Sequence, residues 1–354
     1  MDQKEATIMS ELRQDIATKR WVIVSKERAK RPHQFLKQVT VQEEPDPRDD
    51  CPFCEGNEAQ TPPEVYALRN GSEPNQPGWK VRVVPNKFAA LSLSTKWEGV
   101  QHPEIFTTIS GYGAHEVIIE TPQHNQTLAT LPQEQVEGVL QVVLRRMRTL
   151  AQENRIAFVQ VFRNHGAAAG TSLVHPHSQL IATPIVPTNI REEIEEARRF
   201  YDDRVTCVYC YLLEKELEAG ERIVLQSERY VVLAPFASRF PFELMILPRS
   251  HSPSFVFDAK YEDIGPLADI LRRTLLLLYR AANNPDYNAV LHTAPLRDSC
   301  MDYYHWHLEI VPRLTTPAGF ELGSGIYITT AISEETAQYL REQARQLGID
   351  KAGS

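Results

Sequence analysis

The segment Asn164–Gln179, NHGAAAGTSLVHPHSQ, joins a run of small residues to two histidines that are separated by one proline. Small side chains let the backbone approach a ligand closely, and Gly166 and Gly170 can adopt φ angles that other residues resist. Exposed backbone N–H groups beside the hydroxyls of Thr171 and Ser172 are suited to phosphate oxygens. Taken alone, however, such a loop is explained equally well by tight packing.

The two histidines favour the phosphate interpretation. Alternate residues of a strand lie on one face, so the ring of His177 is expected beside that of His175 and toward the loop. Pro176 cannot donate to a sheet ladder, which predicts an edge or loop-flanking position. A neutral imidazole is a competent nucleophile at phosphorus. Gln179 could donate a hydrogen bond to a phosphoryl oxygen, so His177 and Gln179 are the candidate catalytic residues.

Four of the five cysteines form two Cys-x-x-Cys pairs, Cys51 with Cys54 and Cys207 with Cys210. In a reducing compartment such a pair is mainly half of a metal site or a redox dithiol. Two pairs that are each followed by histidines favour metal, with zinc as the preferred ion. The fifth cysteine, Cys300, we interpret as a small, half-buried residue.

The two halves of the sequence repeat the same features. EVIIETPQH (116–124) and ELMILPRSH (243–251) each contain a glutamate, an apolar run typical of a buried strand, a proline, and a histidine eight residues after the glutamate. Each half also has a Cys-x-x-Cys pair and a His-x-His pair. The repeat predicts an α+β fold of two similar halves, residues 1–195 and 196–354. Each would be an antiparallel sheet with a packed helix, arising from an internal duplication.

Each half is also expected to contain one long amphipathic helix, because apolar residues recur every three or four positions. In the first half these residues follow Pro132, and in the second they precede the His-x-His pair. They are Val136, Val139, Leu140, Val143, Leu144 and Met147, and then Ile264, Leu267, Leu271, Leu275 and Leu278.

The repeat also selects the metal ligands. His115 precedes Glu116, whereas Phe242 precedes Glu243, so we interpret His115 as a hydrogen-bonded histidine at the start of a strand. His124 does have a counterpart. We therefore predict two closed tetrahedral sites of the structural kind, about two zinc ions per chain. Their ligands would be Cys51, Cys54, His124 and His175, and Cys207, Cys210, His251 and His305.

The chemistry is expected in the first half, because the second lacks the loop and has Glu309 where the first has Gln179. A carboxylate there would repel a phosphate. Arg28 and Arg31 could bind a diphosphate, although a solvated basic turn is the better explanation on charge alone. Asn86, in VPNKFAAL, could bind a base or ribose, or could simply occupy a turn.

Composition narrows the functional class further. The chain has 354 residues, 42% hydrophobic and 24% charged, with a net charge of −8. This balance is typical of a globular protein and argues against nucleic acid or an anionic membrane as a partner. The N-terminal residues lack an apolar targeting core, and no stretch approaches the ~18 apolar residues of a membrane span. A cytoplasmic protein is expected.

Together these segments resemble the galactose-1-phosphate uridylyltransferase family of the histidine-triad superfamily. The matching pieces cover most of the chain: RWVIVSKERAKRP, CPFC, VPNKFAAL, TPQHNQTL, VQVFRNHGAAAGTS, HPHSQ, PFELMILPRSH and HWHLEIVPR. The resemblance implies two histidine-triad-like halves and a ping-pong transfer in which His177 carries the nucleotide. It implies phosphate contacts at Asn164, Gly170, Thr171, Ser172 and Gln179, nucleotide contacts at Arg28, Arg31 and Asn86, and a homodimer whose partner chain completes the sugar site.

Two departures from the best-known members concern the second metal and the sugar loop. Those members lack the second Cys-x-x-Cys pair and use a glutamate and histidines, for which Glu193, His292 and His307 are available here. We prefer the cysteine site because thiolates bind zinc more strongly. The segment GFELGSG, with Phe320 and Gly323, replaces the usual sugar loop and is similar to the ADP-glucose:phosphate adenylyltransferase branch.

The leading hypothesis is a UDP-glucose:hexose-1-phosphate (galactose-1-phosphate) uridylyltransferase of galactose metabolism, acting on a nucleotide sugar and a sugar 1-phosphate or phosphate. The alternative within the fold is an ADP-glucose phosphorylase with the same nucleophile. The alternative from another class is a non-catalytic, zinc-stabilised nucleotide-binding module.

Overall fold

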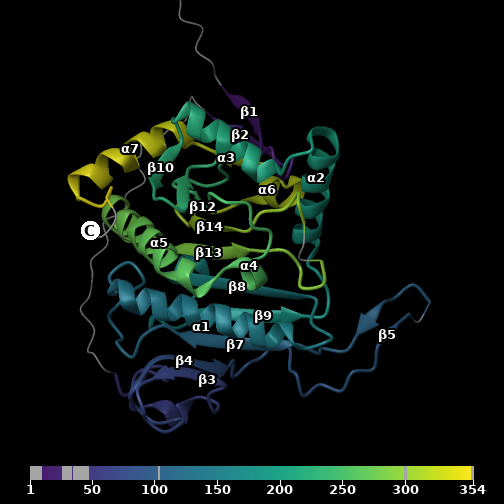
Figure 1. Ribbon diagram of the computed structural model, residues 1–354, viewed down its shortest axis with the longest axis vertical. Helices are drawn as coiled ribbons and strands as arrows, with labels where there is room; N and C mark the ends of the chain where they lie inside the picture. The colour runs from purple at the N-terminus through teal and green to yellow at the C-terminus, as the bar shows by residue number, and fades with distance from the viewer. Residues whose placement is uncertain (1–9, 26–33, 35–47, 103, 299–300, 352–354) are drawn as a thin grey trace, which may run out of the picture.

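The computed structural model describes residues 10–25, 34, 48–102, 104–298 and 301–351, and it is a mixed α+β structure built on one ten-stranded antiparallel sheet (Figure 1). The strands are β3 (Tyr66–Arg69), β4 (Trp79–Pro85), β7 (Ala114–Ile119), β8 (Phe158–His165), β9 (His177–Thr183), β10 (Ile223–Gln226), β11 (Tyr230–Leu233), β12 (Leu244–Pro248), β13 (Tyr287–His292) and β14 (His307–Pro312).

The halves of the chain share this sheet. Its order is β10-β11-β12-β14-β13-β8-β9-β7-β4-β3. Counted outward from the centre of the sheet, the strands of the two halves follow the same order: β8, β9, β7, β4 and β3 in the first half, and β13, β14, β12, β11 and β10 in the second. The halves join where β8 and β13 pair antiparallel, with Asn164 opposite Asn288. Each half therefore contributes five antiparallel strands, as expected, and hydrogen bonds between β8 and β13 join the two sets into one sheet.

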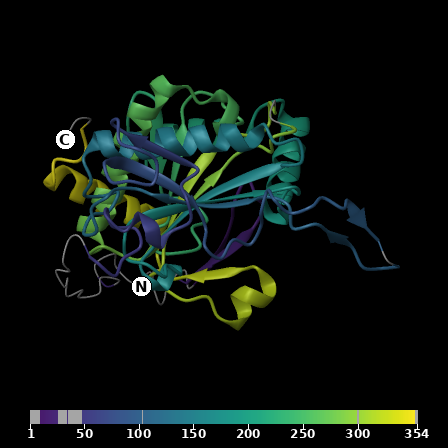
Figure 2. The same cartoon turned by 90° about the horizontal axis from the view of Figure 1, so that it is seen from below.

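Both predicted long helices are confirmed, as α1 (Gln133–Ala151) and α5 (Tyr261–Ala281), and they lie side by side on one face of the sheet (Figures 1 and 2). Their apolar stripes, which include Val139 and Leu271, join the largest buried cluster. The guanidinium of Arg148 on α1 donates to the carbonyls of Val256 (2.9 Å) and Ala259 (2.6 Å), so polar contacts also connect the halves. Val256 lies in the short helix α4 (Phe255–Asp258), and α7 (Ser333–Gln346) packs beside α5.

The opposite face of the sheet carries the cysteine pairs and the helices α2 (Thr188–Arg204) and α3 (Val208–Ala219). A small sheet of β1 (Glu11–Gln14), β2 (Trp21–Val24) and β15 (Tyr327–Thr329) joins the two ends of the chain. The helix α6 (Gly319–Ser324) precedes β15, and the hairpin of β5 (Val100–Gln101) and β6 (Thr108–Ile109) extends away from the body (Figure 2). Two 3-10 turns cover Glu58–Gln60 and Ala167–Ala169.

The predicted boundary between residues 195 and 196 falls inside α2, which continues without interruption from Thr188 to Arg204. A division before α2 fits the secondary structure better. Within the described residues, no helix combines the length and the apolar character that a membrane span needs.

The register of the sheet corrects the alignment of the two halves. In β7, Val117 lies opposite Gln179, and in β12, Met245 lies opposite Glu309. The position of Glu243 in the second half therefore corresponds to His115 in the first, not to Glu116. Glu116 faces the helices instead, where Arg146 holds its carboxylate with two hydrogen bonds of 2.7 and 2.9 Å. The glutamate-to-histidine spacing matches in the sequence only because the connections after the two strands differ in length.

A buried ion pair stabilises the helix side of the sheet beneath the His-x-His strand. Arg163 donates to Glu120 at 3.0 Å, and the hydroxyl of Ser178 donates to the same carboxylate at 2.6 Å. Both charged side chains are almost fully buried. Breaking such a pair leaves an uncompensated charge, at a cost of about 3–5 kcal/mol.

We therefore expect Arg163→Met to lower the free energy of unfolding by about that amount, measured by urea denaturation with circular dichroism. Arg20→Met is the matched control, because Arg20 pairs with Glu192 at 3.3 Å on the surface. Exposed pairs contribute little. Equal effects of the two substitutions would contradict the assignment of the buried pair as a stabilising contact.

Candidate active site and metal centres

His177 is the first residue of β9 and is buried, with 7% of its surface exposed. Its Nδ1 lies 2.8 Å from the carbonyl oxygen of His175. Because a carbonyl only accepts, Nδ1 carries the proton and Nε2 keeps the free lone pair of a nucleophile. Burial lowers the pKa of His177, which favours the neutral ring. The ring of Phe53 packs edge-on against it, with the ring centroids 5.3 Å apart.

His175 itself precedes β9, so the two histidines do not alternate along a strand as expected. Pro176 flanks β9 from the loop side, in agreement with one of the two predicted positions. The other, an edge strand, is wrong, since β9 lies between β7 and β8. The short loop before the strand lets His175 approach the cysteines while its carbonyl group binds His177.

The amide of Gln179 is oriented by His115. The backbone N–H of Ala90 donates to His115 Nδ1 at 3.3 Å, so the ring proton lies on Nε2. His115 Nε2 then donates to Gln179 Oε1 at 2.8 Å, and Asn86 Nδ2 approaches the same oxygen at 3.4 Å. With its oxygen occupied, Gln179 can present only its NH₂ group to a ligand. His115 lies at the start of β7, as expected, but the sequence did not show that it contacts Gln179.

We expect His115→Ala to leave the amide of Gln179 free to turn its oxygen toward the phosphoryl group. Misplacing one donor costs about 10-fold to 100-fold in rate. Single-turnover measurement of nucleotide-sugar consumption would detect this loss. The control is Glu116→Gln, the neighbouring residue that faces the helices; because it breaks the buried pair with Arg146, both rates are expressed per folded molecule. A rate unchanged in His115→Ala would contradict the role assigned to His115.

The glycine-rich loop is held mostly by its own backbone. The N–H groups of Ala169 and Gly170 donate to the carbonyls of Gly166 (3.2 Å) and Ala167 (3.0 Å). Ala168 N–H donates to the carboxylate of Asp286 at 2.6 Å. The expected run of free amides is therefore wrong for this part of the loop, because a 3-10 turn uses them. Gly166 has φ +81°, and a Cβ there would lie 1.9 Å from Asp286 Oδ1, so only glycine fits.

The residues after the turn remain suited to ligand contact. Gly170 adopts a left-handed conformation with φ +87°, and it is exposed, as is Ser172. The hydroxyl of Thr171 donates to the carbonyl of Leu173 at 3.2 Å. Asn164 lies on the face of the sheet that carries His177, since side chains alternate along β8 and Phe162 lies opposite Gln179.

The first predicted set of metal ligands is brought together. Cys51, Cys54, His124 and His175 place their ligating atoms within 4.8 Å of one another. The Sγ of Cys54 lies 3.4 Å from His124 Nδ1 and 3.6 Å from His175 Nδ1. Zinc–sulfur bonds of about 2.3 Å and zinc–nitrogen bonds of about 2.0 Å at tetrahedral angles give separations of this size. His175 Nε2 donates to the carbonyl of Thr121 at 2.8 Å, which fixes the ring.

The second predicted set also converges. The ligating atoms of Cys207, Cys210, His251 and His305 also lie within 4.8 Å of one another. The Sγ of Cys210 lies 3.4 Å from His251 Nδ1 and 3.5 Å from His305 Nδ1. In both sets the histidines use Nδ1 and the cysteines come from one turn. The four positions fit a tetrahedral zinc ion as well as those of the first set.

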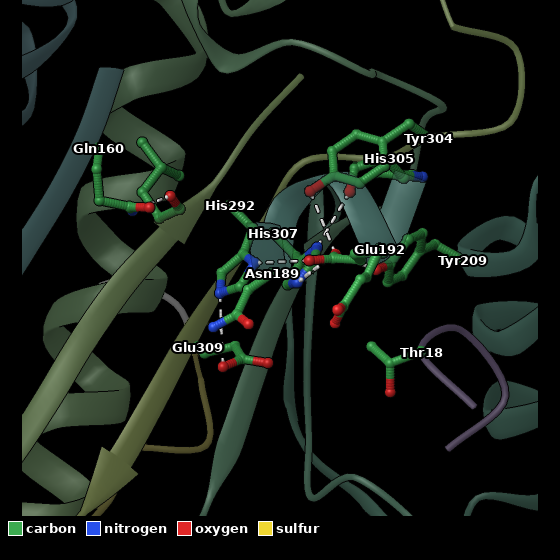
Figure 3. A network of polar contacts seen from close by, with 12 residues as sticks. Thr18, Gln160, Asn189, Glu192, Tyr209, His292, Tyr304, His305, His307 and Glu309 are labelled. Carbon is green, nitrogen blue, oxygen red and sulfur yellow. Dashed lines mark hydrogen bonds and ion pairs between the residues drawn. The ribbon is translucent and has the colours of Figure 1, made fainter. Parts of the chain in front are cut away.

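Glu193, His292 and His307 form a third group, shown in part in Figure 3 beside a cavity of about 300 Å³. His292 Nδ1 lies 3.0 Å from Glu193 Oε2, and its Nε2 lies 3.5 Å from the carboxylate of Glu309. Tyr209 and Tyr304 donate their hydroxyls to Glu193 Oε1. His305 Nδ1 lies beside the Sγ of Cys210, so His305 belongs to the cysteine group and not to the group of Glu193.

Ion pairing favours the charged forms of His292 and Glu193 in this third group. Burial alone would lower the pKa of His292, but the carboxylates of Glu193 and Glu309 raise it to about 10. Burial would likewise raise the pKa of Glu193, yet His292 brings it down to about 2. His307 repeats the arrangement of His177, with Nδ1 3.1 Å from the carbonyl of His305. The carboxylates of Glu193 and Glu309 beside it would repel a phosphoryl group. The carboxylate that acts on His177, Glu120, is instead paired with Arg163 at 3.0 Å.

Several predicted residues are not placed at this site. Arg28, Arg31 and Cys300 lie outside the described residues. Phe320 and Gly323 lie on α6, which contacts β15 and lies apart from β9, the strand of His177 (Figure 1). The structure of one chain therefore does not bring them together with the other candidate residues.

Comparisons with known proteins agree with this arrangement. Residues 1–187 match the family model for galactose-1-phosphate uridyl transferase, N-terminal domain. The chain is 37% identical to an ADP-glucose phosphorylase from Arabidopsis thaliana over 338 residues, 94% of this chain and 92% of the relative. It is 29% identical to a galactose-1-phosphate uridylyltransferase from Thermotoga maritima, over 94% of this chain and 98% of the relative.

Solved structures give the same result. A crystal structure of an ADP-glucose phosphorylase from Arabidopsis thaliana with bound ADP-glucose superimposes with a TM-score of 0.79, 33% identity, and coverage of 94% of this chain and 98% of that one. A uridylyltransferase structure gives a TM-score of 0.73 at 29% identity, covering 96% and 99%. The chain therefore belongs to the galactose-1-phosphate uridylyltransferase family and is a nucleotidyltransferase.

Proposed function

We propose that His177 carries a nucleoside monophosphate during each catalytic cycle. In the first step, His177 Nε2 attacks the α-phosphorus of a nucleoside-diphosphate sugar, and the phosphorus–oxygen bond to the sugar 1-phosphate breaks. In the second step, an oxygen of phosphate or of another sugar 1-phosphate attacks that phosphorus, and the phosphorus–nitrogen bond breaks. The single observation that carries the proposal is the bond from His177 Nδ1 to the His175 carbonyl, which leaves Nε2 as the nucleophilic atom.

The same bond stabilises the intermediate. The ring becomes cationic when Nε2 is bonded to phosphorus. Its remaining N–H, on Nδ1, still donates to the carbonyl oxygen of His175, and the partial negative charge of that oxygen stabilises the cation. The NH₂ group of Gln179, turned outward by His115, can donate to a phosphoryl oxygen as charge develops there. Asn164, Gly170, Thr171 and Ser172 remain the predicted phosphate contacts, and Asn86, Arg28 and Arg31 the predicted nucleotide contacts.

The similarities favour ADP-glucose as the nucleotide sugar and phosphate as the acceptor. The relative with 37% identity is named an ADP-glucose phosphorylase, and a structure of such an enzyme holds ADP-glucose. The second candidate is a UDP-glucose:hexose-1-phosphate uridylyltransferase, because relatives with 29% identity are named galactose-1-phosphate uridylyltransferases. Both use the same nucleophile and leaving group, so they differ in base and acceptor only.

We further propose one zinc ion in each Cys₂His₂ cluster, with His292 and Glu193 acting as an ion pair. Elemental analysis should find about two zinc ions per chain. In a homodimer, Phe320 and Gly323 would serve the sugar site of the partner chain. Light scattering after size-exclusion chromatography would give the oligomeric state.

An exchange experiment tests the proposed function. Labelled glucose 1-phosphate should enter ADP-glucose without any second acceptor, because reversal of the first step needs only the nucleotidyl-enzyme. Parallel reactions with UDP-glucose and galactose 1-phosphate compare the two candidate substrate pairs. Turnover without exchange would contradict the two-step mechanism. Tight nucleotide binding with neither turnover nor exchange would identify a non-catalytic binding module.

A further inference from the structure

The side-chain amide of Asn164 could present either its NH₂ group, a hydrogen-bond donor, or its carbonyl oxygen, an acceptor, to a phosphoryl group. Its NH₂ group would attract phosphoryl oxygens, and its carbonyl oxygen would repel them. Asn164 shares the His177 face of the sheet, so the choice bears directly on the transferred group. The sequence of the loop gives no indication of which end is presented.

Contacts from the second half of the chain make that choice. Asn288 on β13 lies opposite Asn164 and donates its Nδ2 to Asn164 Oδ1 at 2.7 Å. The Nε of Arg313 donates to Asn288 Oδ1. A guanidinium group only donates, so Asn288 must present its oxygen to Arg313 and its NH₂ to Asn164. With its own oxygen occupied, Asn164 has only its NH₂ group left for a ligand.

The three residues are themselves held in place. The backbone N–H of Arg313 donates to the carbonyl of Asp286 at 2.7 Å, and its guanidinium lies 4.9 Å from the ring centroid of Phe240. Asn288 Nδ2 also donates to the carbonyl of Ala169 in the glycine-rich loop at 2.9 Å. The order Arg313, Asn288, Asn164 is therefore a fixed series of hydrogen bonds that ends on the loop side of the candidate active site.

We propose that Arg313 and Asn288 are positioning residues for nucleotidyl transfer, which hold the Asn164 amide as a donor toward the transferred phosphoryl group. The inference rests on the proposed function. It assigns a role to the arginine of the HWHLEIVPR segment, and it makes the second half of the chain a contributor to chemistry in the first. His115 performs the equivalent task for Gln179 from β7.

Asn288→Asp tests the proposal by replacing one amide nitrogen with an oxygen, with almost no change in the shape of the side chain. The carboxylate at position 288 still accepts from Arg313, but it can no longer donate to Asn164. Asn164 must then turn its NH₂ toward position 288 and its oxygen toward the phosphoryl group. We expect the rate of nucleotidyl-protein formation to fall about 100-fold, with only a few-fold change in KM. Zinc content and the melting temperature monitor the fold.

A double-mutant cycle separates this route from the bond to Ala169. If Asn288 acts through Asn164, then Asn288→Asp should have little further effect on the Asn164→Ala variant. An equal fold-loss in both backgrounds would overturn the proposal, as would a wild-type rate in Asn288→Asp alone. Gln160→Glu is the matched amide-to-acid control, because Gln160 donates to Leu291 O at 2.8 Å and lines the cavity beside His292 and His307 (Figure 3). Absence of any nucleotidyl-protein in the wild type would instead overturn the proposed function, and this inference with it.

Discussion

Replacing His177 by asparagine is expected to abolish turnover, with a fall of about 10⁴-fold or more, as when other enzymes lose their nucleophile. Asparagine has no atom that can form the bond to phosphorus, yet its amide can still donate to the His175 carbonyl. The fold and both metal clusters should therefore survive. Steady-state turnover, zinc content and the melting temperature would be measured on the same preparation.

His307→Asn is the matched control for that substitution. His307 also begins a strand, β14, and also places its Nδ1 near the carbonyl of the histidine two residues earlier, at 3.1 Å. It lies among carboxylates, so no phosphoryl transfer is expected there. Turnover per folded molecule should be retained in His307→Asn. Substantial turnover in His177→Asn would eliminate the covalent mechanism at this residue.

The second large effect concerns the two metal clusters, which should differ in their influence on catalysis. Cys54→Ser and Cys210→Ser each remove one thiolate from a Cys₂His₂ set, and each should lower the zinc content by about one ion per chain. Structural zinc contributes folding free energy directly, on the order of 10 kcal/mol or more in isolated zinc-finger peptides. Both variants should therefore melt at markedly lower temperatures.

Among the residues that the structure describes, the first cluster is the one connected to the proposed nucleophile. Its proposed zinc ligand His175 supplies the carbonyl that orients His177, so relaxation of the cluster would release the ring of the proposed nucleophile. Cys54→Ser should lower the single-turnover rate of the folded protein at least tenfold, since small misplacements of a catalytic group are costly. Cys210→Ser should leave that rate near the wild-type value. Equal rates in the two variants would show that the first cluster does not position His177.

The features that local sequence carries were predicted well. The apolar residues after Pro132 repeat every three or four positions, and they form α1 as expected. The cysteine and histidine spacing likewise indicated both groups of four residues, which the fold brings within ligand distance. Each of these signals depends on helix period, on strand-like apolar runs or on a short Cys-x-x-Cys turn, all of which are local.

The pairing and register of strands that are distant in the chain could not be predicted from local sequence patterns. The eight-residue spacing aligned Glu116 with Glu243, but hydrogen-bond register places His115 at that position of the sheet. A shift of one residue moves a side chain to the other face, and no local pattern reports it. The bonds from Arg313 through Asn288 to Asn164 depend on the pairing of β8 with β13, which joins the two halves.

The most direct test of the central claim is the intact mass of the wild-type protein after brief exposure to ADP-glucose and, separately, to UDP-glucose. We predict a gain of one nucleoside monophosphoryl group per chain, mapped to His177 by peptide analysis and removed by phosphate or a sugar 1-phosphate. The same treatment should add nothing to His177→Asn. Full turnover with no adduct under any condition, or an adduct on another residue, would contradict the account.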